Sequence, residues 1–194
     1  MLFLLLTSLV QAPTRDSVAY DLVPASRFEV LTAKAGLLGF AGHAHTIAAR
    51  AFSGRIVIHR DRPAESHVTV TILTDSLVVL TPPDTAEIRK VTQAMRDDVL
   101  DVKHHPEITL ASRQVEIAGD TVRLNAALTI KGQTREIPLV ILLTTLGDTL
   151  RAHTTFAIKQ TDFGIRPYRG GPGGTVRVAD RVTFTIEAVA QRRP

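Results

Sequence analysis

The segment TVRLNAALTI, residues 121–130, alternates apolar and polar side chains along most of its length. One face carries the apolar side chains of Val122, Leu124, Ala126, Leu128 and Ile130. The opposite face is mostly polar, with Arg123 and Asn125 among its members. A period of two residues is typical of a β-strand that buries one face against an apolar core. The segment therefore predicts a half-buried strand.

Short turns with glycine flank this strand and the next one. Gly119-Asp120 precede it, Lys131-Gly132-Gln133 follow it, and Gly147-Asp148 come one strand later. The same alternation recurs after residue 17, in SRFEVLTA (26–33), HVTVTIL (67–73), EITLASRQVEI (107–117), REIPLVILL (135–143), TLRAHTTFAI (149–158) and DRVTFTIEAVA (180–190). Strands joined by tight turns form an antiparallel meander, and a long meander closes to remove its edges. The fold class predicted is mainly β, a closed antiparallel barrel.

The segment TPPDTAEIRKVTQAMRDDVL, residues 81–100, breaks this pattern. Thr81 and Asp84 have capping-box spacing, and Pro82 suits a first helical turn. An apolar stripe at helical spacing follows, made of Ile88, Val91, Met95 and Val99. Pro106 ends any helix by residue 105. We expect one amphipathic helix of about four turns that covers part of the barrel or plugs its end.

Length and composition indicate a single domain, which we place at residues 18–191. The chain has 194 residues, of which 44% are hydrophobic and 22% charged. It has no cysteine, which excludes disulfides, thiolate metal sites and a cysteine nucleophile. The opening MLFLLLTSLVQA, residues 1–12, predicts a signal peptide, because it is apolar, ends on small residues and is too short to span a bilayer. We therefore expect a periplasmic or secreted protein.

The net charge of +4 and the sequence pI of about 9.8 raise the question of nucleic-acid binding. Aromatic residues make up only 5% of the chain, tryptophan is absent, and the basic residues are scattered rather than grouped. The sequence offers neither a stacking platform nor a basic recognition helix, so we expect no nucleic-acid partner. Transient contact with an anionic membrane surface remains open.

His43 and His45 form the one pattern that suggests a metal site. On a strand they would project to the same side. A zinc site needs three or four ligands, and His104-His105 could add only one more, because adjacent strand residues face opposite ways. The motifs HExxH and GxSxG are absent. We expect no cofactor and no enzyme activity, with a metal-dependent enzyme using His43 and His45 as the alternative.

Five short segments, in order, resemble the polyisoprenoid-binding, YceI-like family of bacterial lipocalin-like barrels. They are Phe-Ser-Gly-Arg-Ile at 52–56, Thr-Asp-Ser-Leu at 74–77, His-Pro-Glu-Ile-Thr-Leu at 105–110, Leu-Thr-Ile-Lys-Gly-Gln-Thr at 128–134 and Thr-Asp-Phe-Gly-Ile at 161–165. The resemblance runs from about Tyr20 to Ala190. His105, Leu110 and Gln160 depart from the family's usual aromatic, phenylalanine and arginine.

The resemblance implies a lipocalin-like barrel of about eight strands that holds a long isoprenoid or similar lipid. The expected function is non-enzymatic binding or carriage of a polyisoprenoid, a quinone-like molecule or a fatty lipid. The predicted bore residues are Phe28, Val30, Val70, Ile72, Leu110, Leu128, Ile141, Phe156, Phe163 and Phe184. The predicted residues at its mouth are His43, His45, Arg50 and Arg166. A ligand-free interaction module, as a homodimer through a strand edge or the helix, is the other alternative.

Overall fold

The computed structural model describes residues 17–34, 44–80, 85–170 and 176–193. The predicted signal peptide, the proposed capping residues Thr81 and Asp84, and His43 lie outside the described residues. Part of the glycine-rich segment between residues 164 and 178 also lies outside them.

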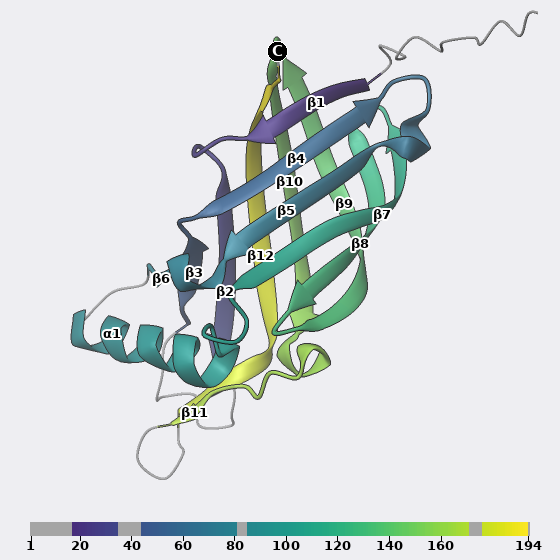
Figure 1. Ribbon diagram of the computed structural model, residues 1–194. Coiled ribbons are helices and arrows are strands. Elements are labelled where there is room, and N and C mark those ends of the chain that lie inside the picture. Colours follow the sequence, from purple (N-terminus) through teal and green to yellow (C-terminus); the bar gives the residue numbers. More distant parts are fainter. Residues whose placement is uncertain (1–16, 35–43, 81–84, 171–175, 194) are drawn as a thin grey trace, which may run out of the picture.

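Eight antiparallel strands close into a ring, and their order around the ring follows their order in the chain (Figure 1). The order is β1 (Ser17–Leu22), β4 (Phe52–His59), β5 (His67–Leu73), β7 (Glu107–Ala118), β8 (Thr121–Ile130), β9 (Gln133–Leu146), β10 (Thr149–Lys159) and β12 (Val176–Arg192). The ring closes because β12 pairs with β1, where Tyr20 lies opposite Arg192. The prediction of a closed antiparallel barrel of about eight strands is confirmed.

A second group of short strands extends the wall at the end of the barrel that carries the helix. These are β2 (Arg27–Lys34), β3 (Thr46–Ala49) and β6 (Leu77–Val79), joined in that order to the side of β12 that also pairs with β1. The two-residue strand β11 (Arg169–Gly170) pairs with the start of β12. The segment between residues 164 and 178 therefore contains a short strand pairing.

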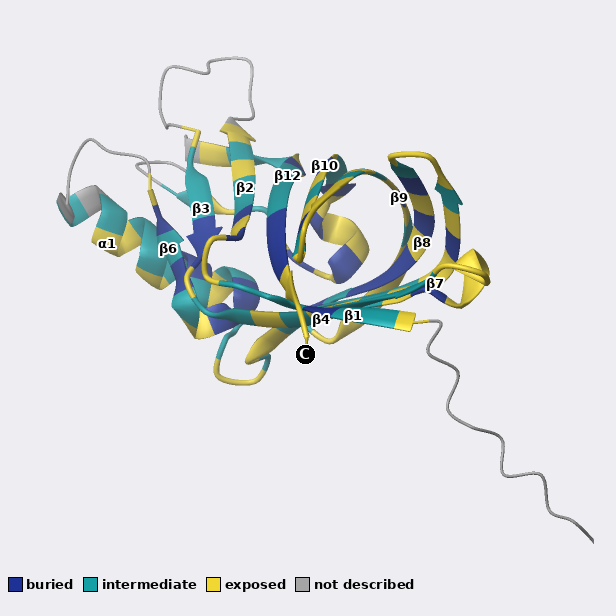
Figure 2. Cartoon of the chain, turned by 90° about the horizontal axis from the view of Figure 1, so that it is seen from above, coloured by how far each residue is buried: buried dark blue, intermediate teal, exposed yellow. Residues whose placement is uncertain are grey.

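The three glycine turns form as the sequence predicts, each with two residues between paired strands. Lys131 and Gly132 both have positive φ angles, 49° and 71°, as a type I′ turn requires. Along β8, buried residues alternate with exposed ones from Val122 to Ala126, and Figure 2 shows the same alternation of colours on β8. Tight turns thus fix the register that sends the apolar face of each strand inward.

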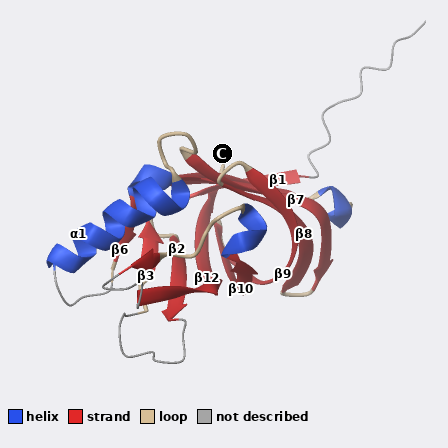
Figure 3. Cartoon of the chain, turned by 90° about the horizontal axis from the view of Figure 1, so that it is seen from below, coloured by secondary structure: helices blue, strands red, loops and turns tan. Residues whose placement is uncertain are grey.

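The predicted amphipathic helix is present. Helix α1 (Thr85–Ala94) continues directly into a π-helical segment, Met95–Leu100. Met95 and Leu100 are buried in the core at this end of the barrel, and Lys131 Nζ donates a hydrogen bond to the carbonyl of Val99 at 3.0 Å. Figure 3 shows the helix beside this end of the ring. No helix in the described parts of the chain is both long and apolar enough to cross a bilayer.

Three short helices complete the structure: η1 (Pro63–Glu65), η2 (Thr74–Ser76) and η4 (Gln160–Phe163). Helix η4 packs against β9, β10 and β12. From below it is seen within the outline of the ring (Figure 3). The same end of the barrel is therefore covered by α1 with its π segment and by η4.

Candidate functional site: an apolar bore

The barrel is hollow. A cavity of about 230 Å³ runs through it, whereas one water molecule needs roughly 10–15 Å³ by the same kind of measure. On β8 the lining extends from Val122 to Ile130, which is roughly 27 Å along the strand and about 20 Å along the axis of a barrel with tilted strands. A bore of this length and width suits a slender chain rather than a compact ligand.

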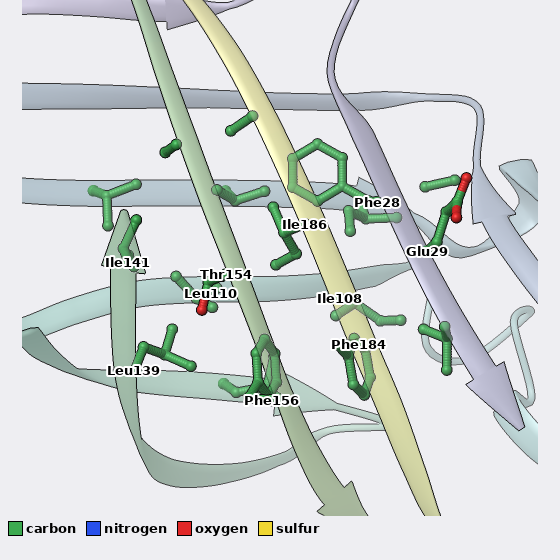
Figure 4. Close-up of a pocket in the computed structure, with 18 of the residues that line it drawn as sticks. Phe28, Glu29, Ile108, Leu110, Leu139, Ile141, Thr154, Phe156, Phe184 and Ile186 are labelled. Carbon is green, nitrogen blue, oxygen red and sulfur yellow. The ribbon is translucent and has the colours of Figure 1, made fainter. Parts of the chain in front are cut away.

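Nine of the ten predicted bore residues line this cavity. They are Phe28, Val30, Val70, Ile72, Leu110, Leu128, Ile141, Phe156 and Phe184, and Figure 4 labels five of them. Strand alternation accounts for their placement, since each side chain lies on the inward face of its strand. Whether these residues bind a ligand remains a prediction. Phe163 lies elsewhere: it belongs to η4, is only 1% exposed, and packs in the core at the helix end of the barrel.

Many side chains inside the barrel are only partly buried, which is unusual for residues that face the interior. Val70, Ile72, Leu110, Phe156 and Phe184 are all in this state, although they point away from bulk solvent. A packed core leaves few voids larger than a water molecule, so such residues would otherwise be buried. Their exposed area is the wall of the cavity.

Two aromatic pairs shape the bore. The rings of Phe156 and Phe184, on paired positions of β10 and β12, stack with centroids 5.0 Å apart and planes 4° apart. The rings of Phe28 and Phe52 lie 4.8 Å apart in a tilted arrangement. Such geometries stabilise aromatic contacts and hold the rings in fixed positions along the wall.

The polar side chains of the lining already have protein partners. Thr154 Oγ1 donates to the carbonyl of Val140 at 2.8 Å, and Gln160 Nε2 donates to the carbonyl of Ala179 at 2.8 Å. Ser66 Oγ accepts from the backbone N–H of His59 at 3.0 Å. Glu29 is the one lining residue in the described chain with a full negative charge, and it lies near β3 at the edge of the bore (Figure 4). The bore therefore presents a mainly apolar wall.

Buried clusters lie at both ends of the bore. Tyr20, Leu150 and Ala190 form one cluster at the end that carries the β9–β10 turn; Leu150 and Ala190 are 0% exposed. Each lies two positions beyond a lining residue on the same face of its strand. At the opposite end, Phe163 and Ile165 pack with residues of the π segment and of β12.

An acidic residue of β12 holds η4 in place. The carboxylate of Asp180 accepts hydrogen bonds from the backbone N–H of Thr161 at 2.9 Å and from Thr161 Oγ1 at 2.8 Å. The backbone hydrogen bond contributes most to lowering the pKa of Asp180 below its ordinary value. This contact fixes the helix that lies at one end of the bore.

The predicted mouth residues are not brought together at the bore. His45, Arg50 and Arg166 are not among the residues that line it, and His43 lies outside the described residues. The backbone N–H of His45 donates to Thr32 Oγ1 at 3.0 Å, while Arg50 lies in the β3–β4 turn and Arg166 follows η4. All three lie in connections outside the strand faces that form the wall, and their role at the mouth remains a prediction.

Sequence reasoning missed several lining residues that the same alternation could have identified. Leu22, Ile56, Ile108, Leu139 and Ile186 all line the cavity from strand positions of the inward face. The described residues contain no group of three or more His, Asp or Glu side chains placed to hold a metal ion. Of the pair His104-His105, which the sequence offered as a source of one further metal ligand, His104 contacts a carboxylate: its Nδ1 lies 2.8 Å from Asp101 Oδ1.

Comparison with protein families gives a match to the YceI-like domain over residues 25–190. The chain belongs to the YceI-like family. A search of curated proteins gave no match.

Solved structures show the same fold at low sequence identity. The YceI-like chain is 21% identical to BcnA of Burkholderia cenocepacia, with a TM-score of 0.68 and coverage of 88% of this chain and 99% of that one. It is 15% identical to a polyisoprenoid binding domain from Saccharophagus degradans implicated in plant cell wall breakdown, with a TM-score of 0.66 and coverage of 91% and 99%. It is 18% identical to the YceI protein of Campylobacter jejuni, with a TM-score of 0.58 and coverage of 76% of this chain and 85% of that one.

Proposed function

We propose that this YceI-like protein binds the apolar chain of a long amphiphile, such as a polyisoprenoid, a quinone-like molecule or a fatty lipid, and carries it without chemical change. The hollow apolar bore is the observation that carries this proposal. A ligand held by shape and burial needs no catalytic group. The Saccharophagus degradans relative is described as polyisoprenoid-binding, which supports the same ligand class.

Energetics favour a long chain over a short one. Each buried methylene group contributes about 0.8 kcal/mol, whereas association costs roughly 4–15 kcal/mol in lost freedom of motion. A chain of only a few carbons therefore cannot offset the cost of association. A chain that fills the length of the bore offsets it through apolar contact alone.

The proposal includes a location in the periplasm or outside the cell, where a lipid would need a carrier to cross water. The apolar segment at residues 1–12 supports export. Determination of the N-terminal residue of the mature protein, together with fractionation of the cells, tests this part. Retention in the cytoplasm with an intact N-terminus would overturn it.

Ligand binding is tested by extraction of natively purified protein into organic solvent, followed by mass spectrometry. We expect a long-chain lipid in near-equal molar amount to the protein. In a series of alcohols of increasing chain length, affinity should rise roughly fourfold per methylene and level off when the bore is full. An empty extract together with no length dependence would rule the proposal out.

A matched pair of variants assigns binding to the bore. Val70→Trp places an indole in the cavity, whereas Thr69→Trp places the same group on the exposed outer face of β5. We expect Val70→Trp to abolish binding of the longest alcohol and Thr69→Trp to leave it unchanged. Equal affinity in both variants would place the ligand outside the barrel.

A further inference from the structure

The backbone ladder of the barrel is incomplete between β9 and β10, although Phe156 and Ile137 both pack against the cluster that contains Leu139. The two strands pair at five positions beside their turn, from Leu146 opposite Thr149 to Leu142 opposite His153. Beyond this ladder, residues 133–141 of β9 and 154–159 of β10 have no strand pairing with each other. On the β10 side this unpaired stretch measures about 17 Å along the strand. We call it the β9–β10 seam.

Each strand of the seam follows its other neighbour instead. β9 pairs with β8 at every position of β8, from Thr121 to Ile130, and β10 pairs with β12 over its whole length. In Figure 4, Leu139 and Ile141 on β9 lie apart from Phe156 on β10, and Leu110 of β7 is seen between them. The seam therefore arises because two well-paired strand pairs, β8–β9 and β10–β12, diverge from each other.

Side-chain contacts define both ends of the seam. Where the ladder stops, Thr154 Oγ1 donates to the carbonyl of Val140, which β10 backbone would otherwise have satisfied. At the other end, η4 packs against β9, and Gly164 approaches the side chain of Gln133. The seam is thus an unpaired stretch of fixed length.

The residues around the seam are apolar on the inner and the outer surface of the barrel. The cavity reaches the seam through Leu139, Ile141 and Phe156. The Phe156 ring stacks on Phe184 of β12, so its main aromatic contact is on the side away from β9. On the outer surface, Val140 and Leu142 are each 56% exposed. Isolated exposed apolar residues are common, but these two lie on β9 where its pairing with β10 ends, over side chains that line an apolar bore.

Buried clusters lie at both ends of the bore, as described above. On the β5–β7 side of the barrel, other contacts continue the junction beyond its ladder: η1 packs against β7, and the backbone N–H of Val68 donates to Ser112 Oγ at 3.0 Å.

We infer that the β9–β10 seam is the portal through which the apolar chain of the ligand enters and leaves sideways. Unpaired backbone groups of the strand edges are then available to its polar head. This inference rests on the proposed function.

A cross-link across the seam tests the portal, since the native chain has no cysteine to interfere. Pro138→Cys with Ala157→Cys places thiols at positions that would be opposite if the β9–β10 ladder continued. A short bis-maleimide then ties the two strands together. The matched control, Thr144→Cys with Arg151→Cys, carries the same link at a pair already within the ladder.

The readout is the rate at which dansyl-labelled geranylgeraniol loads into and leaves each protein. We expect the seam link to slow both rates by about tenfold or more while the dissociation constant changes by less than about twofold. The ladder link should leave the rates unchanged. Equal rates in the two linked proteins overturn the portal.

A second pair of variants avoids any demand on cross-linking or refolding. Val140→Asp puts a charge on the outer lip of the seam, whereas Leu146→Asp puts one on the same strand at its turn, where Leu146 is 81% exposed. We expect slower loading only for Val140→Asp, and equal loading rates overturn the portal. If the unmodified protein takes up no probe, the proposed function fails and the portal with it. If it binds but the seam variants load normally, the portal alone fails.

Discussion

The Leu22 side chain occupies the space that a side chain at Gly54 would need. A β-carbon at Gly54 would lie 2.6 Å from Leu22 Cδ1 and 2.7 Å from the carbonyl oxygen of Thr69. Gly54 belongs to β4, while Leu22 ends β1 and lines the bore. The glycine therefore permits the close approach of three strands where the barrel closes.

Replacement of this glycine should destabilise the barrel. We expect Gly54→Ala to lower the free energy of unfolding by about 1–3 kcal/mol, because the Thr69 carbonyl is backbone and cannot rotate away. Urea denaturation monitored by circular dichroism measures the change, with Ser53→Ala on the same strand as the control. A neutral Gly54→Ala variant would show that the strands separate here without cost.

Two phenylalanines in different environments should lose different amounts of stability when each is replaced by alanine. Phe163 is packed in the core and 1% exposed, so Phe163→Ala should cost about 3–5 kcal/mol of stability. Phe156 lines an existing cavity, so Phe156→Ala enlarges a void instead of creating one and should cost only the transfer term, roughly 1.5–3 kcal/mol. Urea denaturation of both variants without ligand makes the comparison, and equal losses would argue against a hollow interior.

The hydroxyl group of Thr154 should contribute more to stability than the shape of the side chain does. Thr154→Val keeps the volume but leaves the Val140 carbonyl without its donor, which costs about 1–3 kcal/mol when the group is shielded from water. Thr154→Ser retains the hydroxyl and should lose less. Hydrogen exchange of the neighbouring amides in β9 is expected to rise only in the valine variant. Identical exchange in both variants would mean that the hydroxyl does not pin the strands.

The contact between Asp180 and Thr161 predicts a pH dependence. Since the pKa of Asp180 is lowered in the folded protein, its charged form stabilises the fold above the unfolded pKa, about 3.9. This contribution is lost as the pH falls through the lower folded value. We therefore expect Asp180→Asn to be less stable than the native protein at neutral pH, with the difference shrinking below about pH 4. A difference that persists unchanged at low pH would assign the effect to packing.

Most of the barrel could be predicted from the sequence because local signals and the final packing agree. The alternation in residues 121–130 specifies which face of β8 is buried, and Lys131-Gly132 adopts the turn that its residues favour. The long meander indicated closure, and the resemblance of the five ordered segments supplied the strand number. The nine predicted residues that line the cavity all lie on strands, where the direction of a side chain follows from its position in the alternation.

The rest depends on contacts that no local pattern encodes. Phe163 has the apolar character of a bore residue, yet it belongs to a short helix whose orientation is set by Asp180 on a distant strand. Arg50 and Arg166 lie in connections, where sequence gives no face. The seam is equally invisible in the sequence, because the alternation of β9 runs from Ile137 to Leu143 without a break where the pairing with β10 ends.

An unfilled interior also makes the molecule sensitive to hydrostatic compression. Unfolding collapses internal voids and lowers the total volume, so pressure should unfold the empty barrel more readily than a densely packed protein of equal size. A guest that fills the tube removes that volume difference. The pressure at which the fold is half lost, followed by high-pressure nuclear magnetic resonance, would then report directly on occupancy.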